Sequence, residues 1–253
     1  MSVINPRGLL ALTWLEIKIF VREPLGVFGS VFVPVFMFVI ISRTFGSSLT
    51  RNPTGERGLV GADLVVFGAL LLAISAVLSL VTIIAIYRES GILKRLRATP
   101  LRPLTILSAH VLVKVLFTVT TLVISLSLGR RYFAADIPIP WVPFTIATII
   151  SMLSILSLGF VLASVAPTAR FAQPIGTIIL YPMIGISGLF VPLAKMPGPL
   201  QFIAHLTPAS YGVSLMRGAW RGDAWLSHSG DLLGLAVFAA IFTALSVRWF
   251  RWE

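Results

Sequence analysis

The sequence predicts an all-α membrane protein with six transmembrane helices, all in a single domain that spans residues 1–253. Of the 253 residues, 57% are hydrophobic and only 11% are charged, whereas an average soluble domain carries about 25% charged residues. The apolar residues gather in six runs, most of them close to the roughly 20 residues that a helix needs to cross a bilayer. The third observation is that the basic residues lie almost entirely between these runs, where they can meet anionic lipid headgroups. This placement favours a membrane over nucleic acid as the partner of a chain with net charge +11.

Residues 1–23 precede the first run and mix apolar with charged positions. The apolar residues recur about every three or four positions, as in a helix with one apolar face. This pattern predicts an amphipathic helix in the membrane interface, with a frayed tail as the alternative. Glu16 and Lys18 interrupt the segment, so we do not expect it to be a cleavable signal peptide.

The six predicted spans are runs with almost no charge. Pro34 lies inside the first run and is expected to kink it. Lys114 interrupts the third run, and the sixth run is short, with Trp249 and Trp252 placed to anchor its end in the aromatic belt. The spans are residues 24–42, 64–87, 104–129, 141–166, 171–192 and 232–247.

Residues 193–231 are mostly uncharged but are interrupted by prolines, including Pro197, Pro199 and Pro208. A regular spanning helix would lose backbone hydrogen bonds at these positions. We therefore expect a partly buried re-entrant pair or an interfacial helix-turn-helix, placed on the extracellular side. With six spans and a cytoplasmic N-terminus, the inner segments hold 11 Lys and Arg and the longer outer segments hold 8. The higher density inside predicts that both termini are cytoplasmic.

The sequence lacks the motifs of several soluble enzymes. It contains no G-x-x-x-x-G-K-[ST] phosphate loop, so we expect no ATPase site of its own. It contains no cysteine, and its three histidines lie far apart without carboxylates at ligand spacing, so no metal site is expected.

Residues 88–103 form a basic segment between the second and third spans, longer than a simple turn requires. Ile92, Leu93 and Leu96 can share one helical face, and Pro100 ends the pattern. This spacing predicts a short helix parallel to the membrane, with a solvated positive-inside loop as the alternative.

Two stretches of the sequence resemble the ABC-2-type permeases, the membrane subunits of ATP-binding-cassette exporters related to daunorubicin resistance and polysaccharide export. The first stretch is Arg88-Glu89-Ser90-Gly91, followed by Leu96 and Thr99-Pro100-Leu101. The second is Ser187-Gly188-Leu189-Phe190-Val191-Pro192, followed by Met196-Pro197, Pro208, Tyr211 and Arg217. Both stand in the order and at the separation of the family's segments, so the resemblance covers nearly the whole chain.

The resemblance implies a permease that pairs with a second permease, identical or related, in the cytoplasmic membrane of a prokaryote. Separate cytoplasmic ATPase subunits would bind ATP and Mg²⁺, whereas this chain would bind no cofactor. The segment 88–103 would be the coupling helix, and its ATPase contact would use Glu89, Gly91, Leu93, Arg95, Leu96 and Pro100. The segment 193–231 and the residue before it would cap the outer face through Pro192, Pro197, Pro208, Tyr211 and Arg217.

The expected function is ATP-driven export of a hydrophobic or amphipathic cargo, such as a drug, a lipid or a glycoconjugate. The largely uncharged spans suit such a cargo better than a hydrated ion. The alternative is an ion-coupled secondary transporter or a channel, a class that usually carries acidic or paired charges within the membrane. Lys114 is the one charge inside a predicted span, and it either marks a pathway or snorkels to the cytoplasmic interface.

Overall fold

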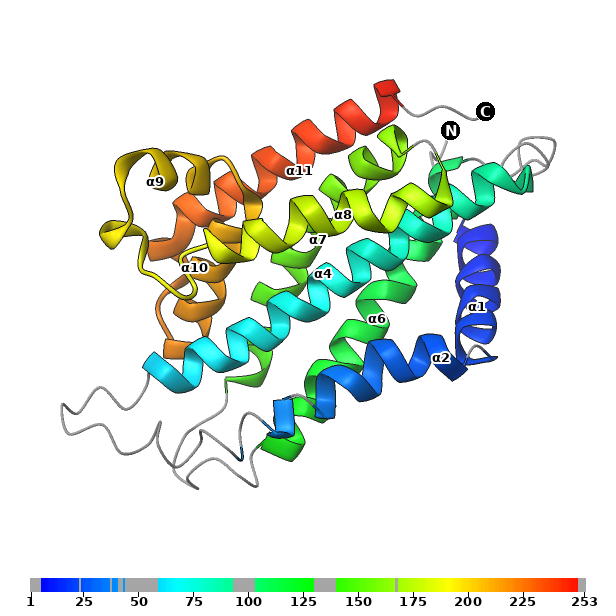
Figure 1. Cartoon of the computed structure of the whole chain (residues 1–253). Helices are drawn as coiled ribbons and strands as arrows, with labels where there is room; N and C mark the ends of the chain where they lie inside the picture. The colour runs from blue at the N-terminus through cyan, green and yellow to red at the C-terminus, as the bar shows by residue number, and fades with distance from the viewer. Residues whose placement is uncertain are drawn as a thin grey trace.

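Four long helices form the centre of the computed structural model, which describes residues 6–22, 24–36, 38–40, 43, 59–92, 103–129, 140–166 and 168–249. They run along one another in a bundle (Figure 1) and are α4 (Leu59–Glu89), α6 (Pro103–Gly129), α7 (Trp141–Val165) and α11 (Ser229–Trp249). All four are long and apolar enough to cross a membrane. They correspond to the predicted spans 64–87, 104–129, 141–166 and 232–247, and the regular elements of the described ranges are all helical.

The other two predicted spans form shorter helices, so their crossing of the membrane stays a prediction. In the span 24–42, α2 (Pro24–Val27) is followed by the π-helical turn η1 (Phe28–Phe32), and residues 33–36 and 38–40 are again α-helical. Pro34 lies two residues after the end of η1 and cannot donate the usual backbone hydrogen bond, which fits a widened turn at this point. In the span 171–192, α8 (Ala169–Gly185) has 17 residues and contains two prolines. It is about 25 Å long at 1.5 Å per residue, slightly less than the hydrocarbon core of a bilayer.

Helix α7 lies at the centre of the packing and contacts α4, α10 (Pro208–Arg221) and α11. Gly159 of α7 allows a close approach to α4, since a Cβ atom there would lie 2.8 Å from Cγ1 of Val77. Ser154 of α7 donates a hydrogen bond of 2.9 Å to the carbonyl of Leu235 in α11. Small residues and interhelical hydroxyl bonds are what membrane helices use to pack, because lipid offers no hydrophobic driving force between helices.

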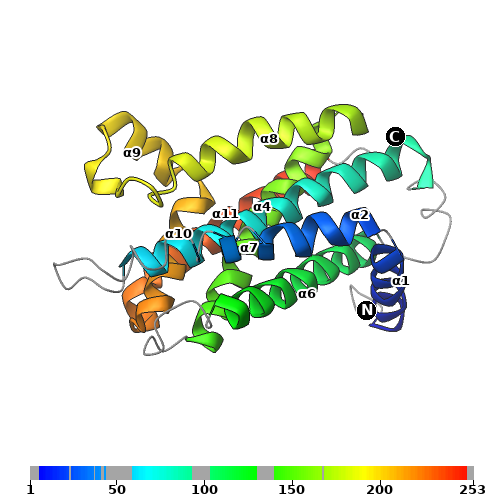
Figure 2. The ribbon, with the colours of Figure 1, turned by 60° about the horizontal axis from the view of Figure 1, so that its bottom comes forward.

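The N-terminal helix α1 (Pro6–Arg22) crosses one end of the bundle and packs against α6 (Figures 1 and 2). Phe20 of α1 packs against Phe117 of α6 with tilted rings, whose centroids are 4.3 Å apart. On the other side of α1, Leu10 and Trp14 are 69% and 70% exposed. A helix with an exposed apolar face fits the membrane interface that the sequence predicts. We call this end of the molecule the α1 end.

Residues 193–231 form a pair of short helices at the opposite end of the bundle, which we call the α9 end (Figure 1). The order is η2 (Leu193–Lys195), α9 (Gly198–His205), α10 and η3 (Trp225–His228). A proline stands before or at the start of η2, α9 and α10, where its missing N–H costs nothing. The prolines therefore begin helices here, and the segment contains the helices α9 and α10, whose placement in the membrane stays a prediction.

Candidate functional site

The last residues of α4 hold the turn between α7 and α8. The guanidinium of Arg88 donates one hydrogen bond of 3.4 Å to the carbonyl of Ala163 and another to the carbonyl of Ala166, both at the carboxyl end of α7. The Oε1 atom of Glu89 accepts a hydrogen bond of 2.8 Å from the backbone N–H of Ala169, the first residue of α8. Thr168 makes no side-chain cap for this helix. Glu89 therefore supplies the cap from a segment 80 positions away.

After Glu89 the chain turns at Ser90 and Gly91, and helical geometry resumes at Ile92. Gly91 has φ +69°, a left-handed conformation that favours glycine. This explains why a glycine stands where the predicted coupling segment leaves α4. The remaining residues of the predicted ATPase contact, Leu93, Arg95, Leu96 and Pro100, lie outside the described residues.

A cavity of about 190 Å³ lies between α4, α6, α8 and the segment that follows η1. Its walls are mostly apolar, with hydroxyl groups from two serines and a tyrosine. The cavity offers a small amphipathic molecule apolar contact and a few hydrogen-bonding groups, the usual composition of a ligand pocket. The lining residues are Val33, Pro34, Phe38, Val65, Phe67, Gly68, Ala69, Leu71, Leu72, Ser75, Leu122, Ser125, Leu126 and Tyr181.

Lys114 is 8% exposed and lies between α1, α4 and α6. Its Nζ atom donates a hydrogen bond of 2.6 Å to Oγ of Ser79 and lies 4.9 Å from the ring centroid of Phe20. The residue lines a second cavity of about 30 Å³, which shares Leu72 and Ser75 with the larger cavity. This volume exceeds what one water molecule requires. The charge of Lys114 therefore lies next to the larger cavity.

A polar cluster that the sequence did not predict ties α1 to the bundle beside Lys114. Glu16 of α1 accepts a hydrogen bond of 3.1 Å from the hydroxyl of Tyr87 in α4. Its other oxygen lies 3.4 Å from Nδ1 of His110 in α6, which is 3% exposed. Glu16 interrupts an apolar pattern in α1, and this interruption is the signal in the sequence that points to a buried role.

At the α9 end, Arg217 of α10 connects three segments. Its Nε atom lies 2.5 Å from Oδ1 of Asp63 in α4. Its two terminal nitrogens donate hydrogen bonds of 2.9 and 2.8 Å to the carbonyls of Gly188 and Leu189, in the loop after α8. Gly188 has φ +86° and turns the chain there. Arg217 was predicted as part of the cap, and Asp63 is the partner that the sequence did not identify.

The other predicted cap residues lie near Arg217 in the chain but make different contacts. The hydroxyl of Tyr211 donates to the carbonyl of His205 over 3.2 Å, which joins α10 to α9. Pro192 precedes η2, Pro197 precedes α9 and Pro208 is the first residue of α10. The prolines therefore position helix starts, and Tyr211 and Arg217 make the polar contacts.

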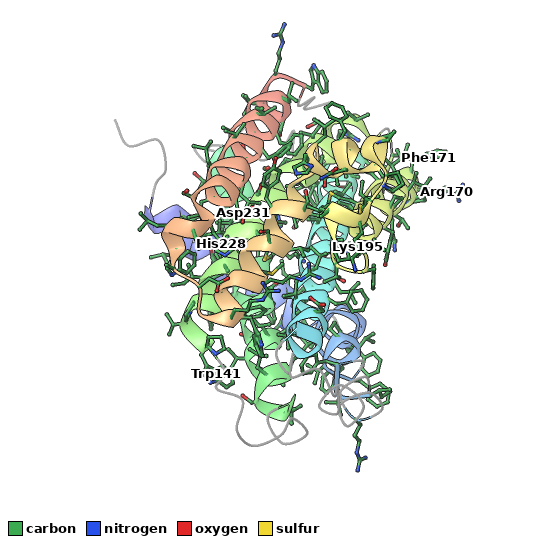
Figure 3. All side chains as sticks on the ribbon, turned by 90° about the vertical axis from the view of Figure 1, so that its left-hand side faces the viewer. Trp141, Arg170, Phe171, Lys195, His228 and Asp231 are labelled. Carbon is green, nitrogen blue, oxygen red and sulfur yellow. The ribbon has the colours of Figure 1, made fainter. Side chains whose placement is uncertain are left out.

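A second unpredicted cluster surrounds His228 at the start of α11 (Figure 3). Its Nδ1 atom lies 2.8 Å from Oδ2 of Asp231, which also accepts a hydrogen bond of 2.7 Å from Ser214 of α10. Asp223 lies 3.4 Å from Nε2 of the same ring. These contacts join α10 to α11. Among the described residues, no group of three His, Asp or Glu side chains has an arrangement that could hold a metal ion.

Comparison with known proteins gives the family. The sequence profile of the ABC-2 type transporter family matches residues 7–220. The chain belongs to this family. As an ABC-2 type permease, it is a transporter subunit without an ATPase domain, and the family implies an ATPase subunit as its partner.

Two relatives of this ABC-2 permease are named for drug resistance. The probable doxorubicin resistance ABC transporter permease protein DrrC of Mycobacterium tuberculosis is 25% identical over 241 residues, which cover 90% of this chain and 83% of the relative. The daunorubicin resistance ABC transporter permease protein DrrB1 of Streptomyces coeruleorubidus is 24% identical over 243 residues, which cover 94% and 84%. The chain is thus a multi-pass membrane protein homologous to bacterial membrane permeases.

Proposed function

We propose that this permease, driven by a cytoplasmic ATPase, moves a hydrophobic or amphipathic cargo outward across the cytoplasmic membrane of a prokaryote. The observation that carries the proposal is the apolar cavity of about 190 Å³ between α4, α6 and α8. The cargo is a drug, a lipid or a glycoconjugate. Among these classes, the names of the two relatives favour a drug.

The size of the cavity supports a second permease subunit, identical or related. Pockets for drug-sized ligands usually measure about 300–1,000 Å³, so the cavity of this chain is too small for such a cargo alone. Helix α8, which forms one wall through Tyr181, also exposes large apolar side chains, among them Phe171 at 54% and Ile178 at 72%. A partner permease packed against this face would cover them and enlarge the cavity.

The ATPase is proposed to contact the segment 88–103, which would place both termini in the cytoplasm. ATP and Mg²⁺ would bind to the ATPase alone. The α1 end then faces the cytoplasm and α1 lies in the membrane interface. The α9 end faces outward, with Pro192, Pro197, Pro208, Tyr211 and Arg217 as its cap. Lys114 is proposed to act on a polar group of the cargo, since it lines the small cavity beside the larger one.

Reconstitution with the ATPase tests the proposal. In vesicles with the α1 end outside, ATP should drive doxorubicin into the lumen. Leu72→Trp places a larger side chain in the cavity wall formed by α4, since a tryptophan buries about 150–250 Å² of its surface. By filling the cavity, this variant should lower doxorubicin uptake per ATP at least about tenfold. Leu233→Trp is the matched control, because Leu233 is 69% exposed on α11 and lies outside the cavity.

Two results would contradict this function. Equal uptake by the Leu72→Trp and Leu233→Trp variants would show that the cavity does not carry the cargo. Uptake that persists without ATP but stops when an ionophore dissipates ion gradients would support the ion-coupled alternative.

A further inference from the structure

Arg88 and Glu89 hold the two helix ends that meet between α7 and α8. Arg88 binds carbonyls of Ala163 and Ala166 at the carboxyl end of α7, and Glu89 binds the N–H of Ala169 at the amino end of α8. Each charge has the sign that the helix dipole favours at that position. Since the two residues are adjacent, a displacement of this part of α4 acts on both helix ends together.

Helix α8 is also held against α4 further along its length. A Cβ atom at Gly176 would lie 2.6 Å from Cδ2 of Leu78, so the two helices are in close contact there. One turn and a little more beyond this contact, Tyr181 of α8 lines the cavity. The route from Glu89 through α8 to the cavity is therefore continuous, and it begins directly before Gly91, where the chain leaves α4.

We propose that Arg88 and Glu89 are positioning residues that transmit movement of the segment 88–103 to α7 and α8, and through α8 to the cavity. This inference rests on the proposed function, in which an ATPase moves that segment. Glu89 would then act within the permease, through its hydrogen bond to the amino end of α8. Loss of its carboxylate should therefore uncouple the cavity from ATP hydrolysis in the complexes that form with the ATPase.

Amide hydrogen exchange of the permease alone tests the contact itself. In Glu89→Ala, exchange in peptides that cover residues 166–172 should be about fivefold faster or more, because the amino end of α8 loses its cap. Glu89→Gln keeps an acceptor oxygen and should be intermediate. Arg170→Gln is the matched control, because Arg170 is an exposed cation at the same turn that extends outward at the edge of the molecule (Figure 3). It should exchange like the wild type.

Cysteine labelling of the complex with the ATPase tests the transmission. The chain contains no cysteine, so Tyr181→Cys provides a single thiol in the cavity wall. ATP should change the rate at which a maleimide labels this thiol. With Glu89→Ala or Arg88→Gln, the ATP-dependent change should fall at least about fivefold, an effect that corresponds to loss of about 1 kcal/mol of coupling. Labelling is compared at a saturating concentration of the ATPase, so that a change in affinity for the ATPase does not enter the result.

Three outcomes would overturn the inference. One is amide exchange over residues 166–172 that is as fast in Arg170→Gln as in Glu89→Ala. Another is an unchanged ATP-dependent labelling change in both Arg88→Gln and Glu89→Ala. The third is weaker ATPase binding in Glu89→Ala with normal labelling changes in the complexes that form, which would make Glu89 an ATPase contact only. None of these readouts requires a cargo, so failure of doxorubicin uptake would reject the proposed cargo without deciding this inference.

Discussion

Replacement of Arg217 by alanine should destabilise the α9 end of the permease. The guanidinium makes three polar contacts, with the Asp63 carboxylate at 2.5 Å and with the carbonyls of Gly188 and Leu189 at 2.9 and 2.8 Å. A hydrogen bond to a charged group contributes about 1.5–3 kcal/mol. The Asp63 and Arg217 side chains are 36% and 19% exposed, so the ion pair alone contributes about 1 kcal/mol or less. With this discount, we expect a loss of about 2–4 kcal/mol.

Thermal unfolding of the purified permease in detergent measures this loss. For a chain of this length, 1 kcal/mol corresponds to about 2–4 °C, so Arg217→Ala should lower Tm by roughly 4–16 °C. Arg217→Lys should lie between alanine and the wild type, because an ammonium group cannot reproduce the planar fork that meets three acceptors. Asp63→Asn should cost less than Arg217→Ala, since the bonds to the two carbonyls remain.

Arg221→Ala is the matched control, because Arg221 is an exposed arginine on the same helix. It should leave Tm within about 2 °C of the wild type. The reasoning would be refuted if Arg217→Ala changed Tm no more than Arg221→Ala. It would also be refuted if Asp63→Asn were more destabilising than Arg217→Ala, because the two carbonyl contacts would then contribute nothing.

Two further predictions concern the packing of α4 with its neighbours. Gly159→Ala should lower the free energy of unfolding by about 1–3 kcal/mol through overpacking, because the new Cβ would lie 2.8 Å from Cγ1 of Val77. Gly230→Ala is the control and should not lower it, since nothing lies within 4 Å of a Cβ at that position. Equal Tm values for the two variants would contradict this prediction. Glu16→Ala removes the bonds that tie α1 to Tyr87 and His110, so trypsin should cleave after Arg22 about fivefold faster, as expected for a loss of about 1 kcal/mol. Unchanged cleavage would mean that apolar contacts alone hold α1.

The long helices could be predicted from the sequence because each is a continuous apolar run bounded by charged or turn-forming residues. Helix α6 continues through Lys114, whose ammonium group donates a hydrogen bond to Ser79 on the neighbouring helix α4. The prolines of the segment 193–231 were also informative, since they stand at helix starts. The end of α8 was not evident, because the apolar run continues past Gly185 while the backbone turns at Gly188 with φ +86°. Apolar composition alone does not distinguish a helix from a buried turn.

The contacts of the candidate sites were hidden for a different reason. Periodicity indicates which face of a helix is apolar, but it does not say which distant residue a charge will meet. Glu89 was predicted as a contact for another protein, and its bond to Ala169 joins positions 80 apart. The partner of Arg217, Asp63, lies 154 positions away. In both cases the useful signal was a charge next to the end of an apolar run, where helix ends leave backbone groups without partners.

These two contacts together explain how α8 is held to α4. Glu89 binds the first residue of α8. Arg217 links Asp63 of α4 to the loop that follows the last residue of α8. Asp63 and Glu89 are about 39 Å apart along α4 at 1.5 Å per residue, so the two contacts share no atoms. Their effects on stability should therefore add within about 0.5 kcal/mol in Glu89→Ala/Arg217→Ala. A larger coupling energy would mean that α8 moves as one rigid body when either end is released, and that release of the α1 end is felt directly at the α9 end.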